Sequence, residues 1–281
     1  MGDTAALAVP RRLRLLVAYD GTDFWGAQVQ PGRRTVGGEL AAAFRRITGD
    51  EPRIILAGRT DRGVHAAGQV AHLDSAATLG DERLGRAINA ALPRDLAVMD
   101  LATVAADFHA RYDACWREYR YRIWNAPVRS PLLARTTWHL ERPLDVAALR
   151  AATATLIGEH DFAAFAGQGL GGPARDQGRS TIRRVLLADW ADQAPGLPGT
   201  RGRIAELRIR ATGFLPQMVR TIVGTAVEVG LGRRDPGWVA TILRGRERAL
   251  APAPAPPQGL TLWRVGYGQP PAPSAGGGDD E

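Results

Sequence analysis

The sequence from residue 57 to residue 66 reads Ala57-Gly58-Arg59-Thr60-Asp61-Arg62-Gly63-Val64-His65-Ala66. It sets one carboxylate, Asp61, between two arginines, and neighbouring positive charge favours the ionised form of a carboxyl group. Gly63 allows a sharp turn just after it, because glycine adopts backbone angles that are closed to other residues. The stretch can therefore hold a fixed carboxylate, but a polar turn without further role explains the same residues. Taken alone, these residues favour the simple turn.

The charge of the chain indicates a polyanionic partner. Its 281 residues carry a net charge of +7, and the sequence pI is near 10.5. Such a balance favours nucleic acid first and an anionic membrane surface second. The sequence contains no lysine, so arginine supplies all 36 basic side chains. Guanidinium groups bind phosphate in a bidentate manner and stack on bases better than ammonium groups do.

Several function classes are excluded or disfavoured by what the chain lacks. Without lysine it cannot form a P-loop, and it has no Gly-x-Ser-x-Gly elbow of a serine hydrolase. Its histidines have neither the spacing nor the acidic partners of a zinc site, so we expect no metal. The single cysteine, Cys115, fits a reducing compartment, and its place beside Trp116 predicts a buried thiol.

The pattern of apolar residues predicts an α+β protein. Strands are expected at residues 12–19, 54–57, 69–73, 96–104, 116–124, 181–190, 203–212 and 259–267, and helices at 36–47, 84–91, 145–157 and 214–230. A glycine-rich loop is expected at 162–180 and a proline-rich linker at 252–257. The strands are two-faced, which favours mixed, largely antiparallel sheets that are covered on one side.

These elements predict two similar α/β domains with a cleft between them. We expect the first domain at residues 11–125 and the second at 126–268, with disordered tails at 1–10 and 269–281. No signal peptide begins the chain and no apolar run reaches membrane-spanning length, so we expect a cytoplasmic protein that does not enter a membrane.

Two segments combine arginine with an element that could bind a nucleotide or a phosphate: a strand with aromatic residues and the start of a helix. Arginines alternate with aromatic residues between Trp116 and Trp124, a pattern that offers stacking surfaces beside phosphate contacts. An edge strand with one core face and one solvated face fits the pattern equally well. The best helix follows Phe214 and carries Arg220 near its start, where an anion could bind. Periodicity alone favours an ordinary core helix there.

Taken together, these segments resemble the tRNA pseudouridine synthase A family, over nearly the whole chain from Tyr19 to Tyr267. The matching blocks are Tyr19-Asp20-Gly21-Thr22 with Gln28 and Gln30, Gly58-Arg59-Thr60-Asp61 with Gly63-Val64-His65-Ala66, Phe108-His109-Ala110-Arg111 with Arg117-Glu118-Tyr119, Phe214-Leu215 with Met218-Val219-Arg220 and Gly224, and Ala255-Pro256-Pro257 with Gly259-Leu260. The second block is highly specific. Ala27 and Pro216 depart from the residues usual in the family.

The resemblance implies a pseudouridine synthase fold and an isomerase that converts uridine to pseudouridine in the anticodon stem-loop of tRNA, at positions 38 to 40, without a cofactor. It implies that Asp61 is the essential carboxylate, acting by covalent attack or by elimination to a glycal. Tyr119 would stack on the flipped uracil, and Leu260 would pack against it. Arg59 would pair with Asp61 and fill the vacated stack, and Arg220 would pair with Asp61 from the other domain. A homodimer is implied as well.

Two alternatives share parts of this pattern. A non-catalytic RNA-binding protein or tRNA chaperone would have the same basic surface and the same arginine-aromatic strand. Asp61, intact between Arg59 and Gly63, favours the enzyme. A phosphate-ester hydrolase ranks third, because the sequence offers no metal site.

Overall fold

The computed structural model describes residues 10–167, 180–196 and 201–271. Its strands are β1 (Arg11–Tyr19), β2 (Ile55–Leu56), β3 (His65–Ser75), β4 (Leu96–Val104), β5 (Trp116–Asn125), β6 (Trp138–Leu140), β7 (Gly158–Asp161), β8 (Ile182–Gln193), β9 (Arg203–Ala211) and β10 (Leu260–Gly266). Its α-helices are α1 (Val36–Thr48), α2 (Asp81–Ala91), α3 (Val146–Ala154), α4 (Met218–Gly230) and α5 (Gly237–Gly245). The described residues thus form an α+β protein, as the sequence predicts.

One sheet runs through the whole molecule in the order β4-β1-β3-β10-β5-β9-β8-β7, and β2 and β6 pair with β3 and β5. The pairs β10–β3 and β5–β6 are parallel, and the other described pairs are antiparallel. The expectation of a mixed, largely antiparallel sheet is therefore confirmed. The last strand, β10, lies between β3 and β5 and joins the two halves of the chain in one sheet.

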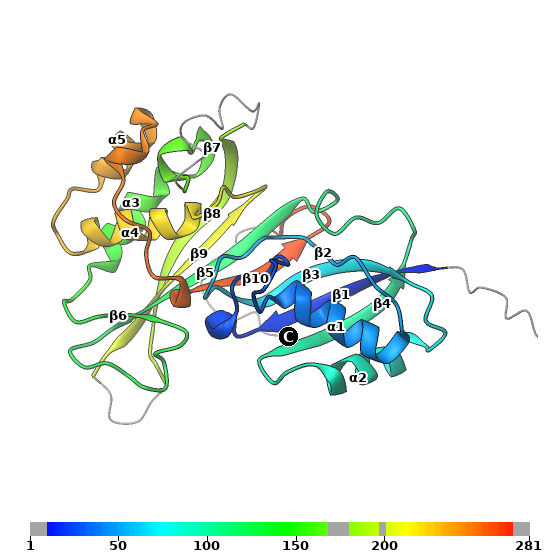
Figure 1. The fold of residues 1–281 in the computed structure, drawn as a ribbon. Coiled ribbons are helices and arrows are strands. Elements are labelled where there is room, and N and C mark those ends of the chain that lie inside the picture. The colour runs from blue at the N-terminus through cyan, green and yellow to red at the C-terminus, as the bar shows by residue number, and fades with distance from the viewer. Residues whose placement is uncertain (1–9, 168–179, 197–200, 272–281) are drawn as a thin grey trace, which may run out of the picture.

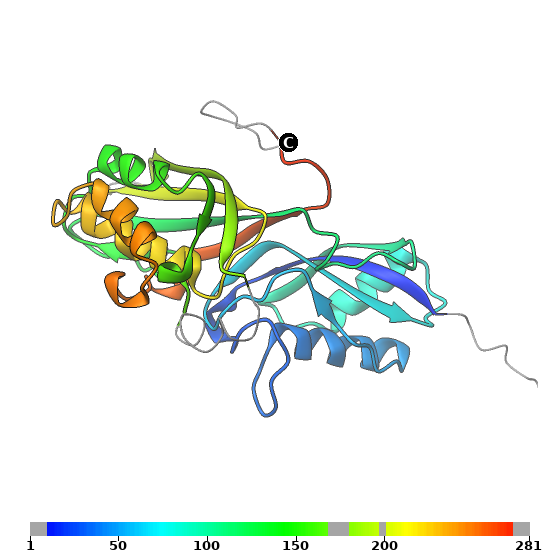
Figure 2. The ribbon, with the colours of Figure 1, turned by 90° about the horizontal axis from the view of Figure 1, so that it is seen from above.

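The helices gather at the two ends of this sheet (Figure 1). The N-terminal half, blue to cyan, and the C-terminal half, yellow to orange, lie at opposite ends when the molecule is seen from above (Figure 2). Helix α1 begins at Thr35, whose side chain accepts the N–H of Gly38, and buries Leu40 and Phe44. Such a cap satisfies a backbone donor that the first turn leaves free. The domain bounds given above stay a prediction.

Several details differ from the sequence-based expectation. Helix α4 begins at Met218 rather than 214, because Gln217 adopts a left-handed φ of 59° and interrupts the helical backbone after Pro216. The expected loop at 162–180 begins with a buried 3-10 turn, Ala163–Phe165, since its residues are small or apolar and pack into the core. The rest of that loop, residues 168–179, lies outside the described residues, as do most of both tails.

Strands β6 and β7 and helix α5 were not predicted, because they are short or too weakly patterned. Cys115 is exposed, not buried. It lies just before the first residue of β5, and the side chain that turns into the protein there is that of the next residue, Trp116. In the described ranges, no helix has both the length and the apolar character needed to cross a membrane.

Candidate active site

Asp61 lies in the turn that connects β2 to β3. The segment leaves β2 at Leu56 and enters β3 at His65, and Gly63 completes the turn with a φ of 78°. A side chain at Gly63 would also come within 3.0 Å of the Pro257 ring. Glycine is therefore required here both by the backbone angle and by the close approach of the segment that leads into β10.

A buried glutamine holds the strand side of this turn. Gln69 on β3 is fully buried and makes two hydrogen bonds with Gly58. Its side-chain amide donates to the Gly58 carbonyl at 2.8 Å, and its Oε1 accepts the Gly58 N–H at 3.1 Å. Gln69 is not among the site residues expected from the sequence. Its signal was a polar side chain among the apolar residues of β3.

Two further contacts brace the residues beside Asp61. The hydroxyl groups of Tyr19 and Thr60 lie 2.8 Å apart, and the Ala27 N–H donates to the Thr60 carbonyl at 3.1 Å. Ala27 departs from the family pattern, but this contact uses its backbone and does not depend on the side chain. The turn that carries Asp61 is thus fixed on both sides by buried polar contacts.

Arg220 reaches Asp61 from the other half of the chain. It lies in the first turn of α4, and its Nη1 is 3.5 Å from Asp61 Oδ2. Its Nε donates to the Ala255 carbonyl at 2.7 Å, which orients the guanidinium. The Asp61 side chain is 39% exposed and that of Arg220 15%. The structure therefore brings these two together, as expected from the sequence, and leaves the carboxylate accessible.

Arg59 does not pair with Asp61. Within the part of the chain that the structure describes, Asp61 pairs with Arg220, and Arg59 is exposed. The expectation assumed an extended segment in which residues two apart point the same way. That assumption is wrong, because the chain leaves the β2 conformation at Leu56 and turns before β3 begins.

Aromatic and apolar side chains form one wall of the cleft that Asp61 also lines. Tyr119 on β5 is buried, and its ring meets that of Phe214 edge to face, with centroids 5.1 Å apart. Leu260, the first residue of β10, is buried in the same wall. Burial, with the neighbouring Tyr19 and the charge of Asp61, raises the pKa of Tyr119 far above its usual value. The hydroxyl of Tyr119 therefore keeps its proton at neutral pH.

These residues line a cleft of about 820 Å³. Its lining holds one carboxylate, Asp61, and five arginines: Arg59, Arg111, Arg117, Arg183 and Arg220. Arg117 was quoted only as part of a motif, yet it binds four backbone carbonyls, those of Ala57, Arg111, Ala114 and Thr212. The cleft is thus strongly positive, with an apolar wall facing a single carboxylate. Such a pocket suits a flat, uncharged base carried on a phosphate backbone.

In the described part of the chain, no group of three or more His, Cys, Asp or Glu side chains could hold a metal ion. Among the described residues, the cleft offers the Asp61 carboxylate, five guanidinium groups and the three aromatic rings of Tyr112, Tyr119 and Phe214.

Comparisons with known proteins point to one family over most of the chain. A family model described as tRNA pseudouridine synthase matches residues 15–113 and 152–268. A tRNA pseudouridine synthase A from Myxococcus xanthus is 41% identical over 270 residues, which cover 96% of this chain and 97% of the relative. One from Geobacillus kaustophilus is 40% identical and covers 92% and 95%. One from Solidesulfovibrio magneticus is 44% identical and covers 92% of each chain.

Proposed function

This chain belongs to the tRNA pseudouridine synthase family, and we propose that it isomerises uridine to pseudouridine in the anticodon stem-loop of tRNA. The observation that carries the proposal is the Asp61–Arg220 pair at 3.5 Å, in a cleft that Tyr119 and five arginines also line. A single accessible carboxylate beside an apolar wall is what a base-directed isomerase requires. The arginines would hold the phosphates on either side of the base.

The reaction breaks the bond between N1 of uracil and C1′ of ribose, turns the base, and joins C5 to C1′. The proton of C5 leaves and N1 gains one, so atoms and electrons balance within the nucleotide. The net change is an isomerisation, and we therefore propose that no cofactor takes part.

Asp61 would carry the essential step by one of two routes. It attacks the nucleotide covalently, or it removes the proton of C2′ so that the base leaves and a glycal forms. Both need an ionised carboxylate. The Arg220 guanidinium beside Asp61 would orient it, and the exposed side of Asp61 leaves room for the ribose.

Tyr119 and Leu260 would hold the uracil after it has left the helical stack, a step that costs a few kcal/mol. Because Tyr119 stays protonated, stacking is its main role in this proposal. A part in removing the C5 proton would need the phenolate, which burial disfavours. Undiminished turnover by Tyr119→Phe would confine the residue to stacking. Arg59, exposed at the cleft, would enter the vacated position in the RNA.

The test is tritium release from tRNA that carries C5-tritiated uridine. We expect release by the wild-type protein and a fall of at least about 1000-fold for Asp61→Asn, since catalytic nucleophiles or bases are rarely replaced without such a loss. Asp100→Asn, on the exposed side of β4, is the matched control. Release by Asp61→Asn at a substantial rate would contradict the role of Asp61. No release by any form, with tRNA binding intact, would favour the RNA-binding alternative.

We further propose a cytoplasmic homodimer. The dimer is supported by a sheet face that points away from the cleft. Trp263 lies on this face and is 36% exposed, and the Arg120 guanidinium is 3.7 Å from the centroid of the Trp263 ring. A second copy could cover this ring. Sedimentation of the purified protein tests it, and a monomer at all concentrations would contradict it.

A further inference from the structure

The segment that joins β4 to β5 presents an aromatic ring to solvent beside the cleft. Tyr112 is 76% exposed. Its ring stacks on that of His109, with centroids 4.3 Å apart and planes inclined by 29°. The Arg111 guanidinium lies 5.8 Å from the Tyr112 ring centroid. One side of the tyrosine ring is thus supported by an imidazole while most of the ring stays accessible.

The turn that holds this ring is tied to the protein through its backbone. His109 Nδ1 accepts the N–H groups of Arg111 and Tyr112 at 3.2 and 3.1 Å. The Ala110 N–H donates to Nδ1 of His72, a buried residue of β3, at 3.0 Å. The Ala110 carbonyl accepts from the Tyr267 hydroxyl at 2.7 Å.

Arginine side chains also hold the backbone on both sides of this turn. Arg12 donates to the Phe108 carbonyl at 2.9 Å, and Arg117 donates to the Arg111 carbonyl at 2.7 Å. Arg117 also binds the Ala57 carbonyl in the segment that leads to Asp61. The position of the exposed ring is therefore coupled directly to the catalytic turn.

Tyr112 stands where two cavities meet. It lines the cleft that contains Asp61, and it also lines a groove of about 950 Å³ that runs along β2 and the start of α1. Four residues line both: Leu56, Arg59, Arg111 and Tyr112. A strand of RNA that places one nucleotide at Asp61 and continues into the groove must pass this ring.

The groove has the charge that such a strand requires. Its two carboxylates, Glu51 and Asp74, are each paired with an arginine at 2.8 Å, Arg45 and Arg12. Three further arginines of its lining, Arg53, Arg59 and Arg111, have no carboxylate within 4.0 Å among the described residues. Exposed aromatic residues scattered singly are common and need no explanation. This one stands on a turn whose backbone is hydrogen-bonded to the protein, stacks on a second ring and is flanked by cations without a carboxylate partner.

We propose that Tyr112 is a stacking platform for an unpaired nucleobase of tRNA that adjoins the target uridine, with the following phosphates lying along the groove. The proposal rests on the function proposed above and adds a binding subsite to it. Aromatic side chains bind unpaired bases through their faces without selecting the base. A ring held in place loses little freedom when a base stacks on it, and this favours affinity.

The test uses an anticodon stem-loop RNA in which 2-aminopurine replaces the nucleotide on one side, and then the other, of the target uridine. Stacking quenches the fluorescence of this base. We expect quenching with the wild-type protein at one of the two positions. For Tyr112→Ala we expect loss of that quenching, a Kd raised roughly tenfold, and a kcat at saturating RNA within about twofold of wild type. Tyr112→Phe keeps the ring and should behave as wild type.

Met99→Ala is the matched control, since it also truncates an exposed side chain, at 63% exposure, but on β4 and outside both cavities. Full quenching and an unchanged Kd for Tyr112→Ala would overturn the proposal. So would a loss for Tyr112→Phe as large as that for Tyr112→Ala, because the contact would then be made by the hydroxyl group. Tritium release by the wild-type protein reports on the proposed function separately. If release fails while RNA binding still depends on the Tyr112 ring, the function is wrong and the platform stands.

Discussion

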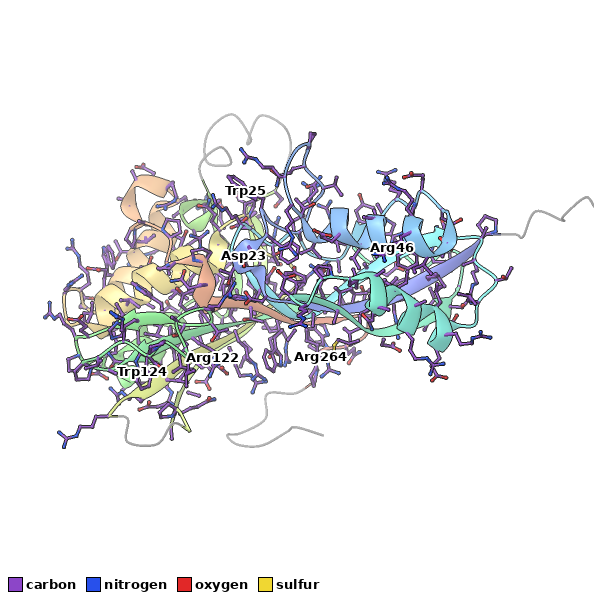
Figure 3. The ribbon with its side chains drawn as sticks, turned by 60° about the horizontal axis from the view of Figure 1, so that its bottom comes forward. Asp23, Trp25, Arg46, Arg122, Trp124 and Arg264 are labelled. Carbon is purple, nitrogen blue, oxygen red and sulfur yellow. The ribbon has the colours of Figure 1, made fainter. Side chains whose placement is uncertain are left out.

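Arginines on the two sides of the central sheet differ in the carboxylates that lie beside them. On the face away from the cleft, Arg120, Arg122, Arg208 and Arg210 surround two buried carboxylates, Glu118 and Glu206. Each of these arginines lies within 3.8 Å of a glutamate oxygen. We call this set the arginine–glutamate face, and its Arg122 lies on the side of the molecule opposite Trp25 (Figure 3). In the cleft, five arginines share the single carboxylate of Asp61.

The difference shows that the placement of acids, not of arginines, decides where the chain can bind a polyanion. Glu118 and Glu206 are 3% and 4% exposed, and such carboxylates stay in a protein only when cations compensate their lost hydration. The arginines of the arginine–glutamate face therefore neutralise these two carboxylates and stabilise the fold. Burial without a carboxylate partner among the described residues lowers the pKa of Arg117 and Arg183 in the cleft. Both donate to backbone carbonyls, Arg117 to four and Arg183 to those of Ser180 and Ile182, and neither is held by a carboxylate.

The largest effect on stability is expected from Glu118→Gln. It would leave Arg210, 6% exposed and 2.7 Å from Glu118, without its charge partner. Breaking a buried pair in this way costs about 3–5 kcal/mol, and urea denaturation measures it. The control is Asp100→Asn, whose 51% exposed side chain pairs with Arg14 and should contribute less than about 1 kcal/mol. Equal losses would show that the arginine–glutamate face is not a buried network, and the comparison would fail.

A smaller effect, on binding rather than on stability, is expected from Arg111→Gln in the cleft. We expect tRNA affinity to fall about tenfold at moderate salt and the slope of log K against log salt to decrease by about one, as for the loss of one phosphate contact. The free energy of unfolding should change by less than about 0.5 kcal/mol, because Arg111 is exposed. Arg233→Gln, whose partner is Glu228 beyond the cleft, should leave the salt slope unchanged. A decrease as large for Arg233→Gln would mean that the whole basic surface, not the cleft, binds RNA.

The sequence was sufficient for the parts of this comparison that are local. Alternation predicted β5 and placed Tyr119 and Arg120 on opposite faces, and the motif around Asp61 marked a turn that lines the cleft. It could not show which arginines are neutralised, because Glu118 meets Arg210 only through the pairing of β5 with β9. Gln69 and Arg117 were overlooked for the same reason: their partners are backbone atoms of distant segments. The expected Arg59–Asp61 pair was wrong because residues two apart point the same way only in extended chain, and these two lie in a turn.

The smallest expected effect is a loss of stability when His72, which lines the groove, becomes protonated at low pH. Burial, then the charges of Arg12 and His109, lower the pKa of His72 to about 4 against the opposing effect of Asp74 and Asp113. A histidine held neutral contributes stability that is present above its unfolded pKa of about 6.5 and is lost as pH falls toward 4. By pH 5.5 we expect a loss on the order of 1 kcal/mol, measured by urea denaturation between pH 7 and 5.

His72→Asn is the control for this loss, since its Oδ1 can still accept the Ala110 N–H but does not titrate. The variant should lose less stability than the wild type over the same pH range. The carboxylates with lowered pKa, such as Asp74 and Asp95, take up protons and reduce stability only at lower pH. That loss should be the same in both proteins. Identical pH profiles would mean that His72 tolerates protonation. The groove beside the cleft would then tolerate an extra positive charge at His72, and the expected loss of stability at low pH would be wrong.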